Sequence, residues 1–235
     1  TLDITHKIKA GKIAGWVDVR DNKANSYLDS LNKLTKELVW QVNALNSEGA
    51  GLHPVSRMTG TVQVSALTDD LGTDFFFSDR YNSGGAFDIV VYDASGQAVN
   101  TYTINPAGNT VGDLINDINT KAAGGGSEIT ASLTGGVSGN FQIQANGAYT
   151  FAIKPNAASQ SSNALAVLGT NTYFSWGEQV GQTVSDITQT IDINPALRVN
   201  AELISSGYLD GNNNVAPGAN EVANAISALQ DKVVP

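Results

Sequence analysis

The sequence predicts an α+β protein in which a helical domain built on one long helix is interrupted by an inserted β-rich domain. A heptad pattern of apolar residues fills the first part of the 235-residue chain, and a second amphipathic helix lies near its end. Between them, apolar and polar residues alternate with the period of two that is typical of β-strands. We therefore expect a discontinuous helical core domain, residues 1–52 and 184–235, and an inserted β-rich domain, residues 53–183.

The long helix is expected from Lys12 to Ser47, after an extended lead at residues 2–8. Two series of residues spaced by seven interleave as the a and d positions of a heptad, and no Gly or Pro interrupts Trp16 to Glu48. Such a helix spans about 50 Å, so its apolar stripe requires a helical partner. The residues expected to pack against that partner are Leu28, Leu31, Leu38, Val42 and Leu45, together with Ile226 and Leu229 of the second helix.

Two features of this helix leave alternatives open. Asp21 occupies an a position, where a carboxylate is rarely buried, so a bend near Asp21–Asn22 would divide the stretch into two ordinary helices. Trp16 and Trp40 lie off the heptad stripe. An exposed tryptophan on a helix is typical of an interface with another domain or subunit, and packing against the β-rich part of the same chain is the alternative.

The middle of the chain is predicted to contain strands, glycine-containing turns and short helices. The strongest strand is Phe87–Tyr92, and the turn Asp93–Gly96 pairs it with the strand that follows. Thr110 is a good N-cap for a helix that begins at Val111. Further strands are expected at 61–65, 99–104, 128–133, 140–145 and 149–154, with a helical stretch at 162–168.

Three more local patterns carry predictions. Asn146–Gly147 is a strong hairpin signal, so the strands on either side of it are expected to pair. Phe75–Phe77 is interpreted as a buried strand, with an exposed apolar patch as the alternative. Towards the end of the chain, an extended stretch is expected at 187–193, ending at Asn194–Pro195, and the second helix is expected from about Asn220 to Val233.

The composition argues against several functional classes. The net charge is −9 with only 13 Lys and Arg, so the chain lacks the basic face that binds nucleic acid or anionic membranes. There is no Cys, which excludes thiolate nucleophiles and cysteine–metal sites. His6 and His53 are far apart in sequence, and no catalytic or phosphate-binding motif is present. We therefore expect no catalysis, no cofactor and no membrane or nucleic-acid partner.

One polar loop carries a weak metal-binding pattern. Asp210, Asn212, Asn214 and Glu221 match four ligand positions of a calcium-binding loop. Val215, however, occupies the position that requires glycine in such loops. A polar turn that leads into the second helix is therefore the favoured interpretation.

Several stretches together carry a resemblance to a known family: Gly11–Asn22, Tyr27–Asn32, Val42–Asn46, Thr103–Asn105, Thr110–Asn119, Leu168–Phe174, Ile193–Leu197 and Gly218–Gln230. They resemble the central part of the flagellar hook-associated protein 1 family, the junction proteins between hook and filament. The resemblance implies an extracellular structural subunit of the bacterial flagellum, without catalytic residues, that is exported by the flagellar type III apparatus and serves motility. The partners it implies are the hook protein, the second junction protein and further copies of the same subunit.

The family also has long terminal helical segments that this sequence lacks. The resemblance therefore implies that the predicted packing residues meet those segments, and that this chain alone is monomeric. A filament cap, a flagellin-like subunit and a surface adhesin with a glycan-binding β domain are the alternatives. An adhesin would be marked by an exposed cluster of aromatic residues and carboxylates, such as one around Tyr81, Tyr173 and Trp176.

Overall fold

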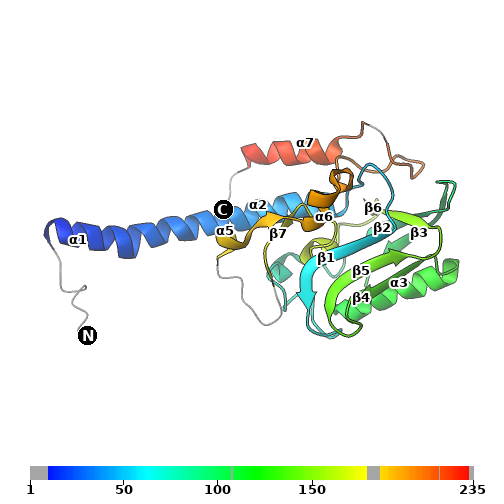
Figure 1. The fold of residues 1–235 in the computed structure, drawn as a ribbon, viewed down its shortest axis with the longest axis horizontal. Helices are drawn as coiled ribbons and strands as arrows, with labels where there is room; N and C mark the ends of the chain where they lie inside the picture. Colours follow the sequence, from blue (N-terminus) through cyan, green and yellow to red (C-terminus); the bar gives the residue numbers. More distant parts are fainter. Residues whose placement is uncertain (1–9, 107, 179–185, 217, 233–235) are drawn as a thin grey trace.

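The structure is a computed structural model that describes residues 10–106, 108–178, 186–216 and 218–232. It confirms the predicted α+β class. Figure 1 shows one long helix that projects from a body of strands and shorter helices. The extended lead expected at residues 2–8, and with it His6, lies outside the described residues.

The long helix is continuous from Gly11 to Ser47. It consists of α1 (Gly11–Asp18), a π-helical turn (Val19–Lys23) and α2 (Ala24–Ser47), so the predicted ends are confirmed to within one residue. The π-helical turn contains Asp21–Asn22, where the sequence left a bend open. A π-helical turn accommodates an irregular position by widening the helix locally, and here the helix remains undivided.

The β-rich part contains two antiparallel sheets of three strands each. The first has the order β1 (Arg57–Val64), β5 (Gly139–Ala145), β4 (Ile129–Leu133), and the second has the order β3 (Ala98–Ile104), β2 (Phe87–Tyr92), β6 (Thr150–Pro155). Each of these strands was predicted. Helix α3 (Val111–Gly125) begins at the predicted N-cap Thr110, whose hydroxyl accepts a hydrogen bond from the Asp113 N–H (3.1 Å). The Asp113 carboxylate accepts a hydrogen bond from the Thr110 N–H (3.1 Å) in return, which completes a capping box that was not predicted.

The hairpin expected at Asn146–Gly147 is wrong. β5 pairs with β1 and β4, whereas β6 pairs with β2 in the other sheet. Asn146 extends the pairing of β5 with β4, because its backbone N–H donates to the Glu128 carbonyl (2.7 Å) and its side-chain amide donates to the Ser127 carbonyl (2.6 Å). The turn that follows, closed by the Tyr149 N–H and the Asn146 carbonyl (3.3 Å), leads into β6. A turn is present at Asn146–Gly147, as predicted. A turn residue shows where the chain changes direction, but it does not determine that the strands on either side of it pair with each other.

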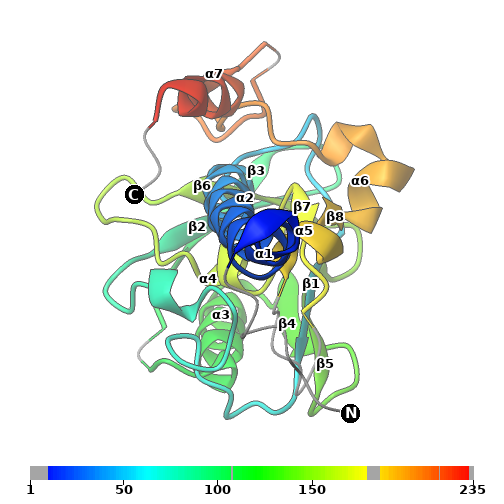
Figure 2. The same ribbon diagram turned by 90° about the vertical axis from the view of Figure 1, so that its left-hand side faces the viewer.

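One cluster of buried side chains joins the inner faces of both sheets, α3 and the base of α2. Val39 and Trp40 of α2 belong to it, together with Phe141 of β5 and Ile153 of β6. Figure 2, seen along the long helix, places the two sheets on opposite sides, with α2 above and α3 below. The division into a helical domain and an inserted domain stays a prediction, and this cluster contains residues from both parts.

Phe75–Phe77 does not form the predicted strand. It lies in a loop that leads into a short 3-10 turn (Ser78–Arg80), yet Phe75 and Phe77 are buried as expected. The Phe77 ring packs against Trp40 (centroids 5.3 Å apart) and against Trp176 (4.9 Å). Aromatic contacts across the core therefore hold this segment, without any strand pairing.

The stretch expected to be extended at 187–193 begins instead with a helical turn, α5 (Ile187–Thr190), followed by β8 (Asp192–Ile193), which pairs with β7 (Phe174–Ser175). The turn docks on the long helix, because Ile187 is buried and the Thr188 N–H donates to Asn32 Oδ1 (3.2 Å).

The remaining short elements are α4 (Ala164–Val167), α6 (Pro195–Val199), a 3-10 turn (Ala201–Leu203), and α7 (Glu221–Ser227) with the 3-10 turn that continues it (Ala228–Asp231). The helix predicted from about Asn220 is thus present, but it is α-helical only to Ser227, and the 3-10 turn ends at Asp231, before the extended Lys232. No described helix is both long and apolar enough to cross a membrane.

Candidate interaction surface

Large apolar side chains lie exposed along the projecting part of the long helix. No residue of α1 or of the π-helical turn is buried, and the first buried residue of α2 is Val39. Trp16 is 71% exposed and Tyr27 is 74% exposed. An apolar surface of this extent is typical of an interaction site. We call it the helix stripe, and it consists of Ile13, Trp16, Val19, Tyr27, Leu28, Leu31, Leu34 and Leu38.

A groove opens where the helix stripe reaches the body. Its apolar walls are Leu34 and Leu38 of α2 and Leu229 of the 3-10 turn after α7. The groove has a volume of about 300 Å³ and a polar rim that includes Gln41 and Lys232, whose side chains approach within 3.4 Å. Figure 1 shows α7 running alongside α2. Two helical segments thus form the walls, and a third apolar element would fill the space between them.

The structure divides the predicted packing residues into two groups. Val42 is buried and Leu45, Ile226 and Leu229 are partly buried by this chain, whereas the helix-stripe members Leu28, Leu31 and Leu38 are each nearly half exposed. Sequence reasoning missed Ile13, Val19, Tyr27 and Leu34, which lie off the strict heptad. For Tyr27 and Leu34, the spacing of four and three residues from Leu31 was the signal that could have found them.

The two tryptophans predicted as possible interface residues differ in exposure. Trp16 is exposed and belongs to the helix stripe, whereas Trp40 is buried within its own chain. The expectation of an external interface at Trp40 is therefore replaced by the alternative that the sequence left open, packing against the β-rich part. Phe77 on the facing loop is the reason, since it offers an aromatic ring to Trp40 and none to Trp16.

Charged side chains hold one side of α2 to the loop that carries Phe75–Phe77. Arg80 Nη2 lies 2.7 Å from Glu37 Oε2, and Glu37 Oε1 accepts a hydrogen bond from Gln41 Nε2 (2.6 Å). Lys36 Nζ lies 4.8 Å from the centre of the Phe76 ring, within the range of a cation–π contact. These contacts hold Glu37 and Gln41 in position at the rim of the groove.

Buried asparagines anchor the base of the long helix. Asn43 is 1% exposed, and its side-chain amide pairs with the backbone of Phe174: Nδ2 donates to the carbonyl oxygen (3.0 Å), and Oδ1 accepts from the N–H (2.8 Å). Asn46 Nδ2 donates to the Asn171 carbonyl (2.7 Å). In return, Asn171 Nδ2 donates to the carbonyls of Ser47 and Gly49, which satisfies acceptors that the end of a helix leaves unpaired.

Asn194 binds the same segment from the opposite side. It is buried, its Nδ2 donates to the Thr172 carbonyl (2.9 Å) and its backbone N–H donates to the Tyr173 carbonyl (2.9 Å). Three stretches that carry the family resemblance, 42–46, 168–174 and 193–197, therefore meet at one place. Sequence analysis did not single out these asparagines, although Asn43 and Asn46 stand beside the apolar heptad positions Val42 and Leu45.

Two buried carboxylates have raised pKa values. Burial at the end of α2 raises the pKa of Glu48 to about 7; the hydrogen bond donated by Ser161 Oγ opposes this rise, and the nearby Asp88 carboxylate adds to it. Burial also raises the pKa of Glu178, although Trp176 Nε1 and the Phe76 N–H each donate to it at 2.8 Å. Both carboxyl groups therefore hold a proton more tightly than a carboxyl group in water does.

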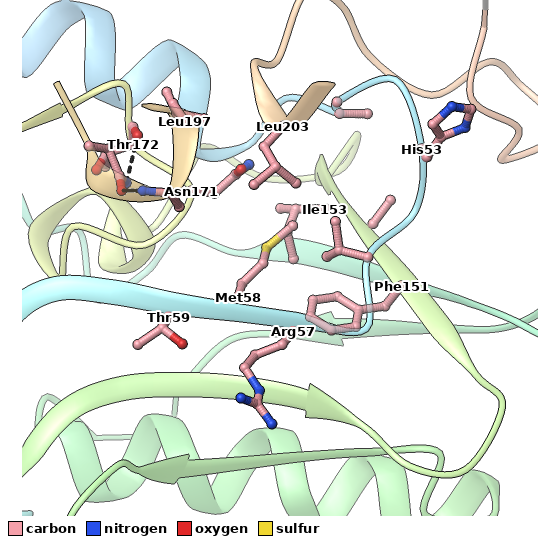
Figure 3. A pocket seen from close by; sticks show the side chains of 16 residues that line it. His53, Arg57, Met58, Thr59, Phe151, Ile153, Asn171, Thr172, Leu197 and Leu203 are labelled. Carbon is pink, nitrogen blue, oxygen red and sulfur yellow. Dashed lines mark hydrogen bonds between the residues drawn. The ribbon is translucent and has the colours of Figure 1, made fainter. Parts of the chain in front are cut away.

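A small cavity lies between β1, β6 and α6, and Figure 3 shows its lining. Its volume is about 70 Å³, and its lining includes Met58, Ile153 and Leu203. The Arg57 side chain points away from it in Figure 3 and donates to Gln144 Oε1 (3.1 Å) across the sheet. The cavity is less than half the size of the roughly 150 Å³ apolar cavity that binds benzene in another protein, so it is too small for a metabolite.

The polar loop with the calcium-like pattern is a turn that packs on the outer face of β2. Asp210 Oδ1 accepts hydrogen bonds from the N–H groups of Asn212 and Asn214 (2.8 Å each). The Tyr92 hydroxyl donates to the Asn213 carbonyl (2.5 Å). Across the described ranges, no group of three or more His, Cys, Asp or Glu is placed to hold a metal ion.

The aromatic cluster expected of a glycan-binding adhesin is not formed by the three residues named for it. Trp176 is buried, while Tyr81 and Tyr173 are each partly buried. The chain matches no protein-family model, and no curated protein is similar to it at a significant level. Among the surfaces described above, the helix stripe and the groove expose the largest set of apolar side chains.

Proposed function

We propose that this chain is the body of an extracellular structural subunit of the bacterial flagellum that joins the hook to the filament, and that it catalyses no reaction. The observation that carries the proposal is the helix stripe: a long helix projects from a packed body and exposes Trp, Tyr and Leu side chains for most of its length. Such a surface is suited to helix-on-helix assembly, because apolar side chains at helical spacing accept the ridges of a neighbouring helix.

The family resemblance supports this proposal from a second direction. Three of its stretches interlock through Asn43, Asn46 and Asn194, so the residues that carry the resemblance also position the long helix on the body. The terminal helical segments that the family has would pack on the helix stripe and in the groove. The hook protein, the second junction protein and copies of the same subunit are the proposed partners. A filament cap or a flagellin-like subunit would use a surface of the same kind.

The proposal is tested by co-sedimentation with isolated hooks. One version is the chain alone, and the other carries the terminal helical segments of a hook-associated protein 1. We expect only the extended version to pellet with hooks, and we expect the chain alone to sediment as a monomer. Failure of the extended version to pellet would contradict the proposed function.

A pair of variants of the extended version tests the role of the helix stripe. Leu31→Asp with Leu38→Asp places charge in the proposed helix interface and should abolish pelleting. Val137→Asp is the matched control, because Val137 is 71% exposed in the turn between β4 and β5, away from the long helix, and it should pellet like the parent. Unchanged pelleting of the double variant would exclude the helix stripe as the assembly surface.

A further inference from the structure

Glu48 lies buried where three parts of the chain meet. It follows the last residue of α2 and is 6% exposed. Next to it, the Ala50 N–H donates to the Gly207 carbonyl (2.9 Å), and the Ser205 N–H donates to Asn46 Oδ1 (3.2 Å). The C-terminal segment, residues 205–216 and 218–231, is thus fastened to the body beside a buried carboxyl group.

The neighbours of Glu48 do not compensate a negative charge. No ion pair among the described residues includes Glu48 or Asp88, and Asp88 on β2 is itself buried. Lys154 on β6 stands opposite Asp88, but its Nζ donates to Asn213 Oδ1 (2.5 Å). A buried carboxylate that lacks a cation is costly when it is ionised and is tolerated when it is protonated.

The C-terminal segment presents further acidic groups to this place. Burial raises the pKa of the Tyr208 hydroxyl, and the charges of Glu48 and Glu221 add to this rise. The Glu221 carboxylate accepts a hydrogen bond from the Tyr208 N–H (3.4 Å). The only hydrogen bond to the Glu48 side chain in the described part of the chain comes from the neutral Ser161 hydroxyl. Ionisation of Glu48 therefore places an uncompensated charge, beside the buried Asp88, where the C-terminal segment is fastened to the body.

We infer that protonated Glu48 holds the C-terminal segment on the body, and that ionisation of Glu48 above neutral pH loosens this segment. The body has its own core, in which side chains of both sheets, α3 and α2 pack together, so we expect it to stay folded when the segment loosens. Leu229 of the C-terminal segment forms one wall of the groove, so the groove is complete only while the segment is held. This last consequence for assembly rests on the proposed function, whereas the loosening itself does not.

Hydrogen exchange of the chain alone tests the inference without any flagellar partner. Protection factors are measured by mass spectrometry at pH 5.5 and pH 8.5, corrected for the intrinsic pH dependence of exchange. Peptides from residues 205–231 should lose protection by about 10- to 100-fold at the higher pH, since a shift from 4.5 to about 7 corresponds to a few hundredfold at most. Peptides from α3 serve as the internal reference and should remain more protected than the C-terminal segment at both pH values, because α3 exchanges only when the body itself unfolds.

Three variants complete the test. Glu48→Gln imitates the protonated acid and should remove the pH dependence, while the exposed Glu202→Gln on the neighbouring 3-10 turn should leave it as in the parent. Asp88→Asn removes a like charge and should move the midpoint of the loosening to lower pH. This third variant keeps the inference testable if Glu48→Gln fails to fold. Protection that is independent of pH in the parent, or that falls equally in Glu48→Gln, would overturn the inference, whatever the outcome with hooks.

Discussion

Both ends of the long helix carry large apolar side chains, at heptad positions and beside them, but the two ends lie in opposite environments. At the base, Val39, Trp40 and Val42 are buried and Asn43 pairs with the backbone of another segment. In the projecting part, Trp16 and Leu31 carry the same apolar chemistry and remain exposed. The difference shows that the pattern specifies which face of a helix is apolar, whereas the partner that lies against that face decides whether it contributes to the stability of this chain.

The largest expected effect compares the two tryptophans of this helix. Trp40→Ala should lower the free energy of unfolding by about 3–5 kcal/mol, because it leaves a cavity beside Phe77 in the main core. Trp16→Ala is the matched control and should change it by no more than about 0.5 kcal/mol. Urea unfolding followed by circular dichroism measures both. Equal effects on the unfolding free energy would mean that Trp16 is covered in solution. The contrast between a buried base and an exposed projecting part of the helix would then be wrong.

The sequence predicted helices and strands from local signals, but it did not predict which of the two tryptophans is buried. Periodicity and turn residues located the long helix, all six strands of the two sheets and the N-cap at Thr110, because those signals are local. The burial of Trp40 depends on Phe77, which lies in a loop far along the chain, and no local signal carries such a contact. The same limit explains the wrong hairpin at Asn146–Gly147, since pairing of β6 with β2 is a long-range choice.

The candidate surface was predicted in part. Leu28, Leu31 and Leu38 were identified from the heptad and lie in the helix stripe. Its other aliphatic members and Tyr27, which lie off the heptad, were missed: Ile13, Val19, Tyr27 and Leu34. The anchoring role of Asn43 and Asn46 was not foreseen, because a polar residue on an apolar helix face is identifiable as an anchor only when its partner backbone is known. Burial of such an amide requires satisfied hydrogen bonds, and the segment 171–174 supplies them.

Asn43 offers the second test of the comparison. Asn43→Ala should cost about 2–4 kcal/mol of unfolding free energy, because both the N–H and the carbonyl of Phe174 lose their partner in a buried place. Asn25→Ala, in the exposed part of α2, is the matched control and should cost no more than about 0.5 kcal/mol. Chemical denaturation at one pH measures the pair. An effect at Asn43 no larger than at Asn25 would show that the anchor adds nothing to stability.

Glu48 adds pH dependence to the base of the helix. Its pKa in the folded chain, about 7, lies above the ordinary 4.5, so the folded state binds the proton more tightly. Its stabilising contribution is complete below pH 4.5 and is lost as the pH rises towards 7. Glu48→Gln should therefore match the parent at pH 4.5 and exceed it by about 2–3 kcal/mol at pH 8. Unfolding curves across this range measure the difference, and a constant difference at all pH values would contradict the assignment.

The smallest expected effect compares two residues of the predicted heptad, one in the projecting part of the helix and one at its base. Leu31→Ala in the projecting part should change the unfolding free energy by no more than about 0.5 kcal/mol, since the side chain is nearly half exposed and alanine favours the helix. Val42→Ala, at the base, removes less apolar volume but should cost about 1–2 kcal/mol because that volume is buried. If Val42→Ala lowers the unfolding free energy more than Leu31→Ala does, the projecting part of the helix contributes little to the stability of this chain. Its apolar heptad residues then remain available to a partner. If Leu31→Ala proves the costlier change, the projecting helix packs against its own chain or another copy in solution, and the helix stripe is already occupied before any flagellar partner arrives.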